Sequence, residues 1–142
     1  MRFERAFSDV HHVASSSFID RFSLDFLEVA PRQPLTMEGT HEVLNHCKGR
    51  YHMHIITNGF FEVQGHKMQA AKLEGYFQHI INSEHVGVRK PHNDIFQYSL
   101  EKAGALKEES LMIGDDWDAD ILGARDFGIE QAYLSTKEIE QN

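Results

Sequence analysis

The stretch LMIGDDWDADILGARDFG, residues 111–128, decides how this chain folds. Its apolar start, Leu111 to Gly114, predicts a buried β-strand, and Ala119 to Phe127 predicts a helix that Gly128 ends. Between and just inside these elements lie four carboxylates within six residues: Asp115, Asp116, Asp118 and Asp120. Polar residues at the junction of a strand and a helix are typical of a ligand site in a parallel α/β sheet.

The same alternation of strand and helix extends back to about residue 38. Three more apolar runs predict strands, at residues 53–56, 79–82 and 131–134. Helical patterns occupy the intervals, at residues 38–48, 61–73 and 91–103. Short strands that alternate with helices indicate a Rossmann-like parallel sheet with flanking helices. The expected fold class is therefore α/β.

Residues 1–34 differ from the rest because they contain no strand-like run. Apolar residues recur there at three- and four-residue steps, which predicts one helix with an apolar face: Phe18, Ile19, Phe22, Phe26 and Val29. The serines at 15–17 are suited to cap its start, and Pro31 follows its end.

Composition limits the function classes. The 142 residues suit one domain, and no apolar run approaches the ~18 residues of a membrane helix. A net charge of −8 disfavours nucleic acids and anionic membranes as partners. The single cysteine, Cys47, and a charged N-terminus without a signal-like run indicate a cytoplasmic protein. The ten histidines show no zinc-ligand spacing, so we expect surface and core roles for them.

Polar groups follow three of the predicted strands. Thr57 and Asn58 follow the first, Lys90 follows the second after a predicted loop at 83–89, and the aspartates follow the third. The carboxyl ends of parallel strands meet at one edge of a sheet. There carboxylates can hold Mg²⁺, while a lysine and a hydroxyl bind phosphoryl oxygens. Phosphoryl transfer needs mainly such positioning and charge stabilisation.

Each group also has a structural explanation. Thr57 could cap a helix, Lys90 could be a solvated charge, and acidic residues are favoured at any helix start. Capping needs only one or two carboxylates, however, and four neighbouring ones repel each other. Their excess favours a bound cation.

The polar clusters carry a resemblance to a known family. Residues 55–59, 86–91, 112–116 and 120–125 resemble motifs II, III and IV of the haloacid dehalogenase (HAD) superfamily of hydrolases. Residues 60–64 and 83–91 are most similar to its pyrimidine-nucleotidase-like branch, in subfamily I with a helical cap. Residues 1–34 resemble part of that cap, and residues 35–142 resemble the α/β core.

The resemblance implies an Mg²⁺-dependent phosphohydrolase that acts on a phosphorylated small molecule, with nucleotides among the candidates, through an aspartyl-phosphate. Thr57 and Lys90 would be catalytic, and Thr57, Asn58 and Lys90 would bind the phosphate. The implied metal ligands are Asp115, Asp116 and Asp120.

One family motif is missing. The nucleophilic aspartate belongs to an Asp-x-Asp-x-Thr motif that follows an early apolar strand, and the only early candidate is Asp9, which we expect in a loop. We therefore predict an N-terminally truncated chain that is inactive alone. The family's motif I strand is central in the sheet, so its absence predicts closure of the gap, a homo-oligomer formed through exposed strand edges, or a fragment of a longer protein.

Two alternatives to the phosphohydrolase are open. One is a non-catalytic HAD-fold protein that binds phosphate or metal, or acts as an interaction partner. The other is a phospho-receiver domain, but there the acidic pair comes early and the lysine late. Here Thr57 comes first, Lys90 next and the acids last.

Overall fold

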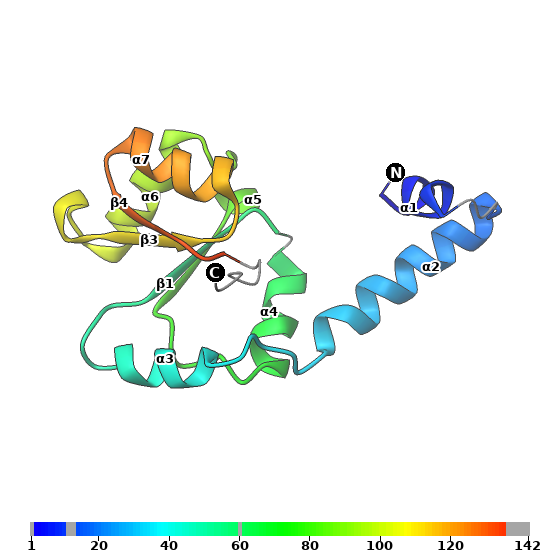
Figure 1. Ribbon diagram of the computed structural model, residues 1–142, viewed down its shortest axis with the longest axis horizontal. Helices are drawn as coiled ribbons and strands as arrows, with labels where there is room; N and C mark the ends of the chain where they lie inside the picture. Colours follow the sequence, from blue (N-terminus) through cyan, green and yellow to red (C-terminus); the bar gives the residue numbers. More distant parts are fainter. Residues whose placement is uncertain (1, 11–13, 60, 136–142) are drawn as a thin grey trace, which may run out of the picture. The chain divides into compact units, whose positions relative to one another are not determined.

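The computed structural model describes residues 2–10, 14–59 and 61–135 (Figure 1). The chain divides into two compact units. The first comprises residues 1–38 and 62–74, and the second comprises residues 39–61 and 75–142.

The first unit is helical. It contains α1 (Arg2–Asp9), α2 (Ser16–Val29), the 3-10 turn η1 (Ala30–Arg32) and nearly all of α4 (Phe61–Ala70). Ser15 caps α2, as its sequence predicts, with its hydroxyl accepting from the Phe18 N–H at 3.3 Å.

Aromatic rings join α1 to α2. Phe3 and Phe7 pack edge to face on Phe22, with ring centroids 5.1 and 5.4 Å apart. The expected loop around Asp9 is wrong, because Asp9 is the last residue of α1. The spacing of Phe3 and Phe7 by four residues, which puts both rings on one helix face, was the signal for this helix.

Among its described residues the second unit contains four strands, which form two separate parallel pairs. Strand β1 (His54–Thr57) pairs with β2 (His79–Asn82), and β3 (Leu111–Gly114) pairs with β4 (Glu130–Tyr133). The registers align His54 with His79 and Leu111 with Glu130. This confirms the α/β class, but within the described residues no strand joins the two pairs into one sheet.

Helices lie on both sides of these strands. Figure 1 shows α5 (Ser83–Val86), α6 (Asn93–Ala103) and α7 (Gly123–Phe127) on one side and α3 (Thr40–Cys47) on the other. The unit also contains the 3-10 helix η2 (Lys107–Glu109) and the π-helix η3 (Trp117–Leu122). None of the helices in the described ranges is long and apolar enough to cross a membrane.

Two of these helices correct the sequence prediction. The expected loop at 83–89 contains α5, which begins where Asn82 accepts the Glu84 N–H at 2.7 Å. The single helix expected at 119–127 is instead a π-helix continued by α7. A four-residue helix has no hydrophobic period to read, and π geometry leaves no distinct pattern in the sequence.

The core lies between the strands and α6 with α7. Ile95 and Phe96 of α6 are fully buried, and the cluster is completed by Ile81, Ala124 and Ile129. Ile56 of β1 and Met112 of β3 both pack against this cluster. The two strand pairs therefore share one layer of apolar side chains.

The opposite face of β3 is open. Leu111 and Ile113 point away from the cluster that Met112 contacts, since successive side chains of a strand alternate between faces. They are 57% and 60% exposed. Such a pair of branched apolar side chains is unusual on a parallel strand, which is normally covered on both faces.

Two histidine rings stack across β1 and β2. The rings of His54 and His79 are 5.2 Å apart and 11° from parallel. Neither ring nitrogen of His54 has a hydrogen-bond partner among the described residues. Burial, and then the charges of His79 and His52, lower the pKa of His54.

The His54 site predicts an acid-sensitive fold. The ordinary pKa is 6.5, so the unfolded chain binds a proton on His54 at a higher pH than the folded chain does. The free energy of unfolding should therefore fall as the pH drops below 6.5, and less so in His54→Leu than in the control His66→Leu. Urea unfolding between neutral and mildly acidic pH measures this. Parallel pH profiles for both variants would contradict it.

Candidate active site

The ammonium group of Lys90 lies at the ends of β1 and β3. Its Nζ donates to the Ile56 carbonyl at 2.8 Å and pairs with Asp120 Oδ1 at 2.5 Å. The two side chains are only 10% and 6% exposed. An ion pair this deeply buried is held in one arrangement, because each charge would be costly without the other.

Asn58 fixes the backbone of the same lysine. Its Nδ2 donates to the Lys90 carbonyl at 3.0 Å, and its Oδ1 accepts the Lys90 N–H at 2.9 Å. The amide group expected to bind phosphate is thus engaged on both sides with Lys90. Thr57, between Ile56 and Asn58, accepts the Gly59 N–H on its hydroxyl at 3.0 Å, which turns the chain after β1.

The π-helix η3 positions two of the aspartates. Asp116 caps it, with Oδ1 accepting from the N–H groups of Asp118 at 3.1 Å and Ala119 at 2.8 Å. Asp120 Oδ2 accepts the Asp116 N–H at 3.3 Å. Asp120 lies against Gly114, where an added Cβ would come within 2.2 Å of its Oδ2. A glycine at the end of β3 is therefore needed to admit this carboxylate.

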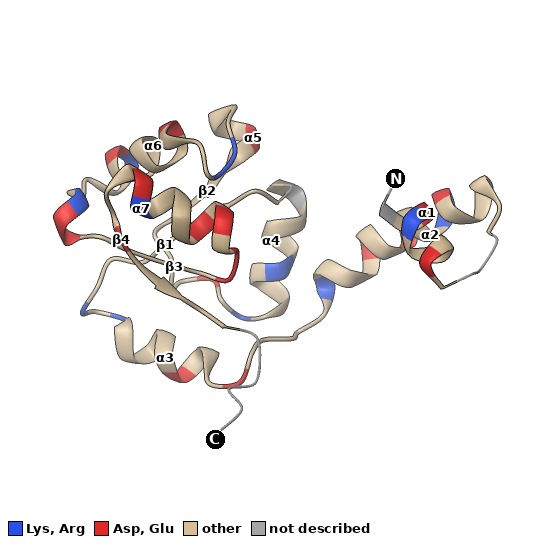
Figure 2. Cartoon of the chain, turned by 45° about the horizontal axis from the view of Figure 1, so that its top comes forward, with Lys and Arg blue, Asp and Glu red and all other residues tan. Residues whose placement is uncertain are grey.

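The fit of these carboxylates to Mg²⁺ is incomplete. Acidic residues gather along the turn between β3 and α7 (Figure 2). Yet the described residues contain no group of three or more His, Cys, Asp or Glu side chains arranged to hold a metal. Asp120 is committed to Lys90, and Asp116 to its cap, while Asp115 is exposed. Mg²⁺ commonly takes one or two protein carboxylates together with water and substrate phosphate, which Asp115 and Asp116 can supply.

Sequence reasoning missed the residues that tie the loops together. Asn82, 1% exposed at the end of β2, donates from Nδ2 to the Gly59 carbonyl. Glu84 Oε2 accepts the Phe61 N–H at 3.0 Å. Both link the segment after β1 to the junction of β2 and α5. The signal was the amide of Asn82, which ends an otherwise apolar run.

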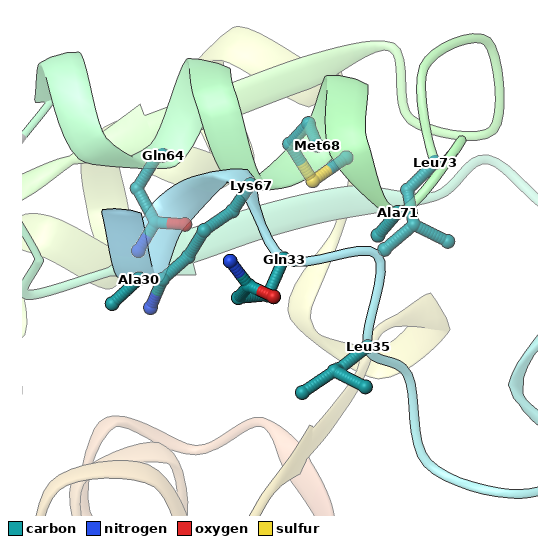
Figure 3. Close-up of a pocket in the computed structure, with 8 residues that line it drawn as sticks. All are labelled: Ala30, Gln33, Leu35, Gln64, Lys67, Met68, Ala71 and Leu73. Carbon is teal, nitrogen blue, oxygen red and sulfur yellow. The ribbon is translucent and has the colours of Figure 1, made fainter. Parts of the chain in front are cut away.

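A separate hollow of about 470 Å³ occurs within the first unit (Figure 3). Its only charged lining residue is Lys67, and the rest of the lining is Ala30, Gln33, Leu35, Gln64, Met68, Ala71 and Leu73. None of these residues was predicted as a site residue from the sequence.

The Asn58 geometry predicts a stability effect. Asn58→Ala leaves the N–H and the carbonyl of Lys90 without these partners, and we expect it to lower the free energy of unfolding by about 2 kcal/mol. The control Asn45→Ala removes one exposed bond to Tyr76 and should change it by less than ~0.5 kcal/mol. Denaturant unfolding compares them; equal losses would contradict a structural clamp at Lys90.

Known proteins are similar to this chain in sequence. Pyrimidine 5′-nucleotidase YjjG of Escherichia coli is 38% identical over 106 residues, which cover 74% of this chain and 47% of that protein. Pyrimidine 5′-nucleotidase PynA of Streptococcus pneumoniae is 29% identical over 99% of this chain and 59% of its own length. The chain thus spans about half the length of these relatives.

Solved structures show the same fold. The HAD-hydrolase YfnB of Bacillus subtilis matches with a TM-score of 0.82 and 23% identity, over 97% of this chain and 62% of that one. The family model of haloacid dehalogenase-like hydrolases matches residues 5–134, which include every predicted site residue. The chain belongs to the haloacid dehalogenase-like hydrolase family.

Proposed function

We propose that this chain is the phosphate-binding part of an Mg²⁺-dependent phosphohydrolase that cleaves phosphate monoesters of small molecules, nucleotides among them. The buried Lys90 ammonium, held between Ile56 and Asp120, carries the proposal. It is a fixed positive charge at the ends of β1 and β3, where ligands of parallel sheets bind. Relatives named as pyrimidine 5′-nucleotidases and as a glyceraldehyde 3-phosphate phosphatase support the substrate class.

Each predicted site residue has a proposed role that follows from its hydrogen bonds and ion pairs. Lys90 would neutralise a phosphoryl oxygen, Thr57 would hydrogen-bond a second one, and Asn58 would hold Lys90 in place. Asp115 and Asp116 would hold Mg²⁺, with Asp120 orienting Lys90. When bound, the ion would offset the negative charge of the phosphate in this acidic chain. A relative of known structure, YfnB, is described as bound to magnesium.

We further propose that residues 1–34 are part of a helical cap, that residues 35–142 form the core, and that the chain alone lacks the nucleophile. Asp9 ends α1 and follows no strand. Cys47 ends α3 and is half-buried, which does not suit a reactive thiol.

A non-catalytic phosphate- or metal-binding role is the second candidate. The Lys90–Asp120 ion pair supports binding of a phosphate or a metal. The absence of an Asp-x-Asp-x-Thr sequence from the given chain disfavours catalysis. Phosphate hydrolysis, measured directly, separates the two.

The metal prediction is tested by calorimetric titration of Mg²⁺. We expect Asp115→Asn to weaken Mg²⁺ binding in the presence of inorganic phosphate by at least about tenfold, because the ion loses a charged ligand. Asp126→Asn, an exposed acid paired with Arg125, is the matched control and should bind as the unchanged chain does. Equal Mg²⁺ affinities for all three proteins would show that Asp115 is not a ligand of the ion.

Hydrolysis by the chain alone should be negligible. We expect release of phosphate from uridine monophosphate and p-nitrophenyl phosphate to equal that of a blank, since the given sequence contains no Asp-x-Asp-x-Thr motif. Lys90→Ala and Asp115→Ala serve as controls for contaminating enzymes. Activity that disappears in these variants would show that this chain is a complete catalyst.

A further inference from the structure

We propose that the exposed rings of Phe61 and His85 bind the nucleobase of a nucleoside monophosphate whose phosphate lies at Lys90. We call the side chains of Phe61 and His85 the ring pair. The inference rests on the proposed function and deepens it, because it selects nucleotides from among the phosphate monoesters of small molecules. Neither ring was predicted as part of the site from the sequence.

The ring pair joins two helices of the second unit. Phe61 is the first residue of α4, and His85 lies in α5. Their ring centroids are 4.9 Å apart, with the planes at 65°, which is an edge-to-face contact. Phe61 is nevertheless 52% exposed, and His85 is exposed as well. Much of the Phe61 ring is therefore available for a second aromatic contact.

Hydrogen bonds hold Phe61 close to the predicted phosphate site. Its N–H donates to Glu84 Oε2 at 3.0 Å. Two residues earlier, the Gly59 carbonyl accepts from Asn82, and the Gly59 N–H donates to the Thr57 hydroxyl at 3.0 Å. Because Phe61 follows Thr57 by four residues, their Cα atoms can be no more than about 14 Å apart.

Lys90 is attached to the same segments as the ring pair. Asn58, which follows Thr57, bonds to both the N–H and the carbonyl of Lys90, at 2.9 and 3.0 Å. His85 lies five residues before Lys90 in the chain. The segment after β1 and the segment from α5 to Lys90 thus carry both the buried ammonium group and the two exposed rings.

The surroundings of the ring pair define the chemistry of its ligand. An exposed phenyl ring offers an apolar, flat surface, on which nucleobases of any sequence stack. The carboxylate of Glu84, which is exposed, and the net charge of −8 disfavour a second anionic group on the ligand. A ligand that suits both has one phosphate and an uncharged planar ring. A nucleoside monophosphate has both features, and an aliphatic phosphate monoester lacks the ring.

A second exposed ring pair supplies a matched control. Trp117 packs edge to face on Tyr133 with centroids 5.4 Å apart, and the two residues are 54% and 47% exposed. This pair follows β3 and β4, whereas the backbone of Lys90 is attached to Asn58, after β1. Phe61 and His85 are therefore favoured as the base-binding rings.

The experiment compares three ligands by calorimetric titration of the full chain with Mg²⁺ present: uridine monophosphate, glycerol 3-phosphate and inorganic phosphate. We expect uridine monophosphate to bind at least about fivefold more tightly than glycerol 3-phosphate, because only the former stacks on Phe61. Phe61→Ala should remove this preference and leave the affinity for inorganic phosphate unchanged. Phe61→Tyr, which keeps a ring, should retain the preference.

The control Tyr133→Ala should also retain the preference. A preference that survives in Phe61→Ala or is lost in Tyr133→Ala would overturn the inference. An equal loss of affinity for inorganic phosphate in Phe61→Ala would do the same, since the ring pair would then be a structural contact only.

Two further outcomes separate this inference from the proposed function. If the unchanged chain binds uridine monophosphate and glycerol 3-phosphate equally, and Lys90→Ala abolishes the binding of both, the inference is wrong and the phosphate site stands. If none of the three ligands binds, inorganic phosphate included, both are wrong.

Discussion

The buried ion pair of Lys90 and Asp120 is the constraint on which the site depends. A lysine that is 10% exposed needs a partner for its charge and its N–H groups, and it finds one carboxylate and one strand carbonyl. These partners come from η3 and β1, so the pair connects segments that are far apart in the sequence. The ion pair explains two neighbouring residues. Gly114 leaves room for the Asp120 carboxylate, and Asn58 holds the backbone of Lys90.

The loops around this pair are linked by a small number of polar bonds. Asn82 binds the Gly59 carbonyl, and Glu84 binds the Phe61 N–H, so the segment after β1 is tied directly to the junction of β2 and α5. Asp116 and Asp120 do the same within the turn after β3. In a family whose members are named for different phosphorylated substrates, loops fixed by such bonds can stay constant while other parts of the protein vary.

The sequence predicted some of this structure well and missed the rest for definable reasons. Residues 79–82 and 111–114 were predicted as strands with the observed bounds, and the other two strands within one residue, because apolar runs bounded by polar turns are strong local signals. α5 was missed because a helix of four residues shows no period. The partners of Lys90 were harder to predict, since its acceptor is the backbone carbonyl of Ile56, which has no signature in a sequence. The stacking of His54 on His79 depends on the register between β1 and β2. These parallel strands are separated by a long stretch of chain, so no short turn between them shows the register in the sequence.

The π geometry of η3 has a consequence for chain length. Within it the Gly123 N–H donates to the Asp118 carbonyl, five residues back, so the turn holds one residue more than an α-helix would. If a related protein lacked one residue in this turn, all of the aspartates could be kept. The side chain that corresponds to Asp120 would nevertheless point in a direction about 100° away around the helix axis. Insertions and deletions in this turn therefore matter as much as substitutions, and an alignment that matches the acids by type alone can join residues that point in different directions.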